Sequence, residues 1–177
     1  MYRIFGIMPS PVSVPDLIVT EDSNSGNDYF SILFGDRCIS SNGKDNIKRV
    51  IAQHPDQSIL AVVDGSAFGP EMQDCMDMIS AVNKTVTVFA PESFEYLILQ
   101  SGVVEVPKDV TEETWNYADS VKYFSWEDFY THYLCDVTRN GIKQYSKGKL
   151  GDFYRTGGNV DKIKSMLPEC IRNMVGK

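Results

Sequence analysis

Short apolar runs rich in β-branched residues alternate, along the first half of the chain, with segments whose apolar side chains recur every three or four positions. The runs are too short for most helices, so they predict strands that are buried on both faces. The segments between them predict amphipathic helices. Strands are expected at 16–20, 37–41, 59–63 and 84–90, helices at 28–34, 44–54, 69–82 and 91–102, and a further short strand at 1–8.

This repeated order of strand and helix predicts the fold class. Parallel strands need crossover connections, and helices supply them on both faces of the sheet. The expected fold is therefore α/β, with a mostly parallel central sheet and helices on both of its faces.

Residues beyond 102 have a different pattern, without strand-like runs. Ser125 followed by acidic residues predicts a helix N-terminus. Residues 144–158 are rich in Gly, Lys and Tyr and predict an irregular loop, and 160–175 predict a last helix that Pro168 kinks. We expect a single domain over 1–177, made of an α/β core over 1–102 and a helical, basic extension over 103–177.

Composition narrows the class of protein. With 42% hydrophobic and 23% charged residues, the chain is ordinary for a globular protein. Its four cysteines are scattered and it has two histidines, which argues against a zinc site or a disulfide framework. No apolar run approaches the roughly 20 residues of a membrane helix, and the N-terminus lacks a basic flank. A cytoplasmic protein, in a bacterial or a host cell, is expected.

The net charge of −7 is unevenly distributed. Residues 1–136 carry 8 Lys and Arg against 21 Asp and Glu, a balance of −13, whereas 137–177 carry 9 against 3, a balance of +6. The basic tail could contact nucleic acid, or it could fold back on the acidic body of the same chain.

Two carboxylates follow predicted strands directly. Glu21 comes after the run LIVT, and Asp64 after LAVV. If the two strands are neighbours their carboxylates converge, which is costly unless one is protonated or a cation lies between them. Oxygen ligands without nearby His or Cys select Mg²⁺ or Mn²⁺. Glu71 is a candidate third ligand, although an acid after Pro70 is also explained by the helix dipole.

The two acidic segments resemble the motifs of the Toprim domain. LIVTEDSNSGNDYF resembles the first motif, a strand that ends in a glutamate, and SILAVVDGS resembles the second, a strand that ends in Asp-x-Asp. The resemblance covers roughly residues 16–100, including SSNGKDNIKRVI, which is similar to a segment of overcoming-lysogenization-defect nucleases. It implies a Toprim or Rossmann-like fold, Glu21 as general acid or base, Asp64 as a metal ligand, and Mg²⁺ or Mn²⁺ as the cofactor.

The sequence departs from this family pattern at one position. Ser66 stands where the family has its second aspartate, so either Glu71 substitutes as the ligand or catalysis is lost. The segments VVDGSAFGPEM and PESFEYLILQSG also resemble bacterial or phage proteins with Toprim-like folds. No P-loop, no Gly-x-Gly-x-x-Gly after a strand and no Gly-x-Ser-x-Gly occurs, so these nucleotide-binding and hydrolase classes are excluded.

The C-terminal part supplies candidate contacts to nucleic acid. Lys143, Lys147, Lys149 and Arg155 alternate with Tyr145 and Tyr154, a mixture that suits phosphate binding and base stacking but also suits a solvated loop. Another possible stacking set, or plain helix core, comprises Trp126, Phe129, Tyr130 and Tyr133.

Two functions of different classes are therefore expected. The first is a metal-dependent, Toprim-type protein that processes nucleic acid or other phosphodiesters. The second is a non-catalytic inhibitor or interaction module, related to phage or defence, that binds a host protein through its acidic surface.

Overall fold

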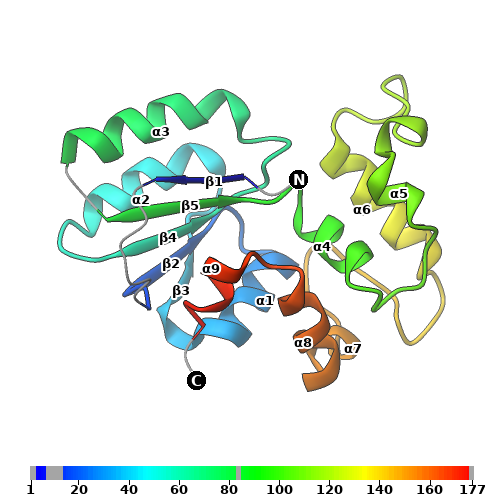
Figure 1. Ribbon diagram of the computed structural model, residues 1–177. Coiled ribbons are helices and arrows are strands. Elements are labelled where there is room, and N and C mark those ends of the chain that lie inside the picture. The colour runs from blue at the N-terminus through cyan, green and yellow to red at the C-terminus, as the bar shows by residue number, and fades with distance from the viewer. Residues whose placement is uncertain (1–2, 7–13, 83–84, 176–177) are drawn as a thin grey trace.

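A computed structural model describes residues 3–6, 14–82 and 85–175 of the chain. Its centre is a five-stranded sheet with the strand order β1-β5-β4-β2-β3 (Figure 1). The neighbouring strands β2 to β5 are parallel, and β1 pairs antiparallel with β5 at one edge. The expected α/β fold with a mostly parallel sheet is confirmed. The strands are β1 Arg3–Gly6, β2 Leu17–Thr20, β3 Cys38–Ser40, β4 Ile59–Val62 and β5 Val86–Ala90.

The helices fall into two groups. Those that follow strands in the core are α1 Ser25–Phe34, α2 Ile47–Gln53, α3 Gly69–Val82 and α4 Phe94–Gln100, with the short turns η1 Gly35–Arg37 and η2 Lys44–Asn46. Those of the C-terminal part are α5 Asp109–Glu112, α6 Trp126–Val137, α7 Asp152–Arg155, α8 Gly157–Ser165 and α9 Glu169–Arg172, with η3 Thr114–Asn116. No helix in the described ranges is long and apolar enough to span a bilayer.

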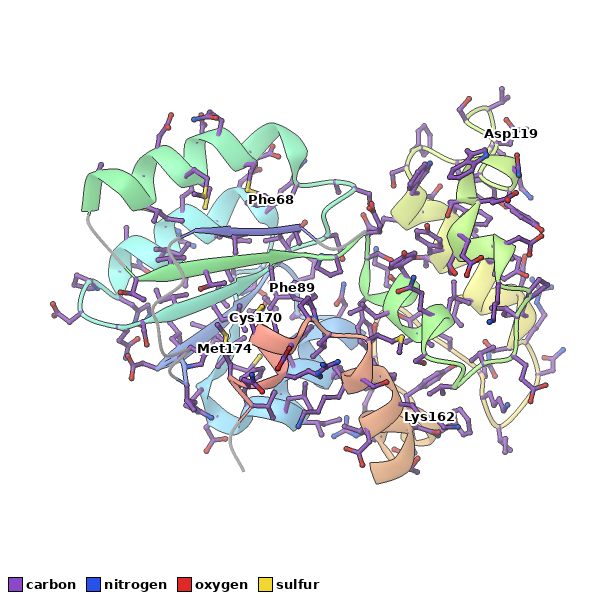
Figure 2. The ribbon with its side chains drawn as sticks, viewed as in Figure 1. Phe68, Phe89, Asp119, Lys162, Cys170 and Met174 are labelled. Carbon is purple, nitrogen blue, oxygen red and sulfur yellow. The ribbon has the colours of Figure 1, made fainter. Side chains whose placement is uncertain are left out.

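Helices cover both faces of the sheet, with α2 and α3 on one side and α1 and α9 on the other (Figure 1). Alternate strand residues point to opposite faces. Leu60 packs in the cluster of α1, and Ala61 in the cluster of α2 and α3. Figure 2 shows the same division, with Phe68 on the α3 side and Phe89 on the α9 side. Burial on both faces explains why the strand sequences are continuously apolar.

The C-terminal part packs on the sheet through the same apolar cluster as α1 and α4. Tyr29 of α1 is buried and donates its hydroxyl hydrogen bond to Val160 O at 3.1 Å. The N–H of Ser25 donates to Lys147 O at 2.9 Å. These contacts bring the C-terminal segment to the beginning of α1, which lies at the carboxyl edge of the sheet.

The structure corrects two expectations for the C-terminal part. Residues 144–158 are not simply an irregular loop, because they contain α7 and the start of α8, and the rings of Tyr145 and Tyr154 are buried. The last helix is broken rather than kinked: α8 ends at Ser165, and Pro168 lies immediately before α9. Proline has no N–H for a helix interior, so the chain turns there and starts a new helix.

Candidate active site at the carboxyl edge of the sheet

Glu21 and Asp64 lie side by side at the carboxyl edge of the sheet. They leave β2 and β4, which are hydrogen-bonded neighbours with Thr20 in register with Val62. The backbone N–H of Glu21 donates to Val62 O at 3.0 Å, and the backbone N–H of Asp64 donates to Glu21 Oε2 at 3.1 Å. The condition under which the two carboxylates were expected to converge is therefore met.

A narrow hollow opens at this pair, with a volume of about 30 Å³. That is room for one or two water-sized groups. We call it the carboxylate hollow. Its charged lining residues are Glu21, Asp22, Asp64, Glu95 and Lys147.

Glu95 is a member of the carboxylate hollow that the sequence analysis missed. It lies in the first turn of α4, just after β5, and is only 2% exposed. The hydroxyl of Tyr145 donates to Glu95 Oε1 at 2.7 Å and lies 2.5 Å from Ser25 Oγ. The sequence offered a signal, because β5 is the next strand to β4 and Glu95 follows it closely, but an acid in a first helical turn usually serves the helix dipole.

Lys147 brings a positive charge to the carboxylates. Its Nζ forms an ion pair with Glu127 Oε1 in the first turn of α6. Burial lowers the pKa of Lys147, but the hydrogen bond to Glu127 and the nearby charges of Glu95 and Asp64 outweigh burial and raise it above its usual value. Lys147 therefore remains an ammonium at neutral pH.

Two acids of the hollow, Glu21 and Asp64, have raised pKa values. Burial raises the pKa of Glu21 to about 7, against the opposing hydrogen bond from the Asp64 N–H. Burial, together with the charges of Glu127, Glu95 and Glu21, raises the pKa of Asp64 well above its usual range. The site therefore holds protons near neutral pH unless a cation compensates the carboxylates.

The donor set suits a hard divalent cation that keeps some of its water. The Asp64 carboxylate accepts no hydrogen bond from any residue in the described ranges, so its oxygens are available. Within those ranges, no group of three or more His, Cys, Asp or Glu side chains is arranged to hold a metal. Mg²⁺ is commonly bound by one or two carboxylates with several waters, and Asp64 with either Glu21 or Glu95, which line the same hollow, provides such a pair.

Two other residues considered for this chemistry lie elsewhere. Ser66 donates its hydroxyl hydrogen bond to Glu92 O at 2.9 Å and does not line the carboxylate hollow. Glu71 lies on α3, where its Oε1 is 3.4 Å from Lys44 Nζ. Glu71 does not line the carboxylate hollow either.

The candidate nucleic-acid contacts are divided by the fold. Lys147 enters the carboxylate hollow, whereas Lys149 and Arg155 are exposed and Lys143 Nζ lies 5.6 Å from the centre of the Phe153 ring. The interleaved tyrosines cannot stack on bases, since Tyr145 is 3% and Tyr154 0% exposed. Their hydroxyls hold Glu95 and Lys143 O instead.

Gly65 fixes the chain immediately after Asp64. Its N–H donates to Pro91 O at 2.6 Å, which ties the loop after β4 to the loop after β5. A Cβ at this position would lie 2.7 Å from Pro91 O and 2.8 Å from Ala90 O. Only glycine allows this close approach between the two loops.

The site combines two acids of raised pKa, Glu21 and Asp64, with the ammonium of Lys147 at a sheet edge where α/β proteins bind ligands. This chemistry suits a phosphate ester approached by a metal ion and a lysine. No protein-family model, no curated protein and no solved structure matches the chain.

Proposed function

We propose that the protein is a metal-dependent, Toprim-type enzyme that cleaves or otherwise processes the phosphodiesters of nucleic acid. The observation that carries the proposal is the pairing of Glu21 with Asp64 across two neighbouring parallel strands, with the Asp64 N–H on Glu21 Oε2 at 3.1 Å. The position of the pair, its raised pKa values and the lysine beside it support the same reading.

Four charged residues of the carboxylate hollow have roles in this proposal. Asp64 would hold Mg²⁺ or Mn²⁺, with Glu95 as a further acid that lines the same hollow. A bound divalent ion would polarise the phosphodiester and stabilise the charge that develops on it. Glu21 transfers a proton at its carboxylate, because a pKa of about 7 allows it to accept and release protons at neutral pH.

Lys147 binds the phosphate in this proposal. Its ammonium is charged and lies at the hollow, so it can pair with a phosphate oxygen while Glu127 keeps it in place. In this proposal, Lys147 is the residue of the basic C-terminal segment that acts at the site. Lys149 and Arg155, which are exposed, would add only electrostatic attraction to the rest of the strand.

The proposal is tested by incubating supercoiled plasmid and single-stranded DNA with the protein and Mg²⁺ or Mn²⁺. We expect nicking or cleavage that EDTA abolishes and that Asp64→Asn reduces by at least about 100-fold, the scale of losing a charge-stabilising group. The matched control is Asp74→Asn on α3, an exposed acid paired with Lys48, which should keep wild-type activity. A wild-type protein that neither cleaves nor shifts its melting temperature with Mn²⁺ would contradict the proposal.

The second candidate function is a non-catalytic interaction module. It is favoured by one observation, the lack of a ready group of three metal-ligating side chains in the described ranges, together with the −13 balance of residues 1–136. In this case the acidic surface binds a basic host protein. Capture of one stoichiometric basic protein, equally by wild type and Asp64→Asn, would support it, whereas metal-dependent cleavage that Asp64→Asn abolishes would reject it.

A further inference from the structure

A second hollow, of about 420 Å³, lies next to the carboxylate hollow and is lined by exposed aromatic rings. Phe124 is fully exposed, and Trp126 is 39% exposed. We call it the aromatic hollow. Its other wall is formed by Gly65, Ser66, Gly69 and Glu92. The volume falls within the range of about 300–1,000 Å³ that is usual for small-ligand pockets.

The two rings face the same space because of the backbone between them. Ser125, the N-cap of α6, is extended, with φ −153° and ψ 168°. Side chains two residues apart on an extended segment point the same way. Phe124 and Trp126 accordingly both line the aromatic hollow. In Figure 2, the label Asp119 marks the part of the chain that precedes this segment and α6.

Residues that belong to the two hollows are consecutive in the chain at two places. Asp64 lines the carboxylate hollow and Gly65 the aromatic hollow. On the opposite side, Trp126 lines the aromatic hollow while Glu127, the next residue, holds Lys147 in the carboxylate hollow. A group bound against the rings would therefore lie near a group bound at Asp64.

The lining of the aromatic hollow favours one class of ligand. No Lys or Arg is among the described residues that line it, so these residues offer a phosphate no cationic partner. A nucleobase suits it better. Its flat face can stack on the rings of Phe124 and Trp126.

The other aromatic residues of this part of the chain do not line the aromatic hollow. Phe129 and Tyr130 of α6 are buried in the core, which excludes them from the stacking set considered from the sequence, and Tyr133 is partly buried. Trp115 is also exposed, at 65%, but does not line the aromatic hollow. Trp115 therefore offers a matched control for substitutions in the hollow.

We propose that Phe124 and Trp126 form a stacking subsite for an unpaired base of single-stranded nucleic acid, beside the phosphodiester held at the carboxylate hollow. The inference rests on the proposed function for the nature of the substrate. It adds that the substrate is single-stranded or locally unpaired. A base in a duplex is already stacked and paired, and would first have to leave the helix.

Binding is measured with a fluorescein-labelled oligothymidylate of about 12 nucleotides, a length within the site sizes of single-strand binders. Ca²⁺ replaces Mg²⁺ so that the oligonucleotide is not cut. We expect Phe124→Ala and Trp126→Ala each to weaken binding about 5- to 150-fold, the range that stacking on an aromatic ring gives. Trp126→Phe and Trp115→Ala should stay within about twofold of wild type, and the corresponding duplex should bind at least about tenfold more weakly.

The outcomes separate this inference from the proposed function. If the protein binds the single strand, loses that binding in Phe124→Ala and Trp126→Ala, and never cleaves DNA, the stacking subsite is supported and the proposed enzymatic function is rejected. If the protein cleaves DNA equally well in wild type, Phe124→Ala and Trp126→Ala, the stacking subsite is rejected and the proposed enzymatic function is supported. Absence of oligonucleotide binding, preference for the duplex, or a self-association in sedimentation that Phe124→Ala abolishes would overturn the subsite.

Discussion

The backbone N–H of Asp64 donates a hydrogen bond to the carboxylate of Glu21 at 3.1 Å, although 43 positions separate the two residues in the chain. The bond joins the ends of β2 and β4, and both acids line the carboxylate hollow. Because the bond uses the Asp64 amide rather than its side chain, the Asp64 carboxylate remains available to a cation.

The first prediction concerns pH and stability. The folded protein holds the Glu21 proton more tightly than the unfolded chain, since the pKa of Glu21 rises from its ordinary 4.5 to about 7. Its contribution to the free energy of unfolding is therefore complete below pH 4.5 and lost as the pH rises to 7. The loss amounts to at most about 3 kcal/mol at 1.36 kcal/mol per pKa unit. The raised pKa of Asp64 acts in the same direction.

Urea unfolding between pH 4.5 and 7.5 in EDTA checks this dependence. Glu21→Gln should flatten it, whereas Glu105→Gln, at an exposed position, should keep the wild-type slope. Added Mg²⁺ should also flatten it, because a cation favours the ionised acids. A wild-type stability that increases over this range relative to Glu21→Gln would contradict the assignment.

The second prediction concerns Lys147. Its replacement by Met leaves Glu127, whose side chain is 16% exposed, without its counter-ion. We expect the free energy of unfolding to fall by about 1–3 kcal/mol, the cost of an unpaired polar group that is largely buried. Lys149→Met, two residues later and exposed, should change it by less than about 0.5 kcal/mol.

A double-mutant cycle extends this measurement. Adding Glu127→Gln to Lys147→Met removes the orphaned charge and should recover part of the lost stability. If the two substitutions are simply additive, the pair makes no net contribution to folding.

The third prediction compares two buried tyrosines. Tyr145 donates to the carboxylate of Glu95 at 2.7 Å, and Tyr154 donates to the peptide oxygen of Lys143 at 2.6 Å. Hydrogen bonds to charged groups contribute more, so Tyr145→Phe should cost about 1.5–3 kcal/mol and Tyr154→Phe about 0.5–1.5 kcal/mol. Equilibrium unfolding of the two variants gives the order, and a larger loss for Tyr154→Phe would refute it.

The fourth prediction concerns the loop after β4. Gly65→Ala places a methyl group against Ala90 O and Pro91 O, so we expect a loss of about 1–3 kcal/mol and a displaced Asp64. Gly158→Ala on α8 is the control, because nothing lies within 4 Å of its Cβ position and alanine favours a helix by up to about 1 kcal/mol. Thermal unfolding compares the two variants. Equal melting temperatures for Gly65→Ala and Gly158→Ala would contradict the prediction, because they would show that the loops after β4 and β5 can move apart to accommodate the methyl group.

The strands and the main acidic pair could be predicted because their signals are local. A run such as 59–63 is apolar enough to identify a buried strand, and Asp64 follows it directly. Prediction was poorer beyond residue 102, where the apolar residues do not form strand-like runs. There Tyr145 reads as a loop residue, although in the fold it is buried against Glu95 and Ser25.

The sequence by itself determined the α/β class and the two acids that end β2 and β4, since both follow from patterns within a few residues. Tertiary structure alone decided that β2 and β4 are neighbours, that Glu95 and Lys147 join their acids, and that Ser66 and Glu71 do not. It also decided that Phe124 and Trp126 are exposed while Phe129 is buried. Tyr145 and Ser25, 120 positions apart, show the reason: contacts over such separations depend on how whole elements pack, and no local pattern records them.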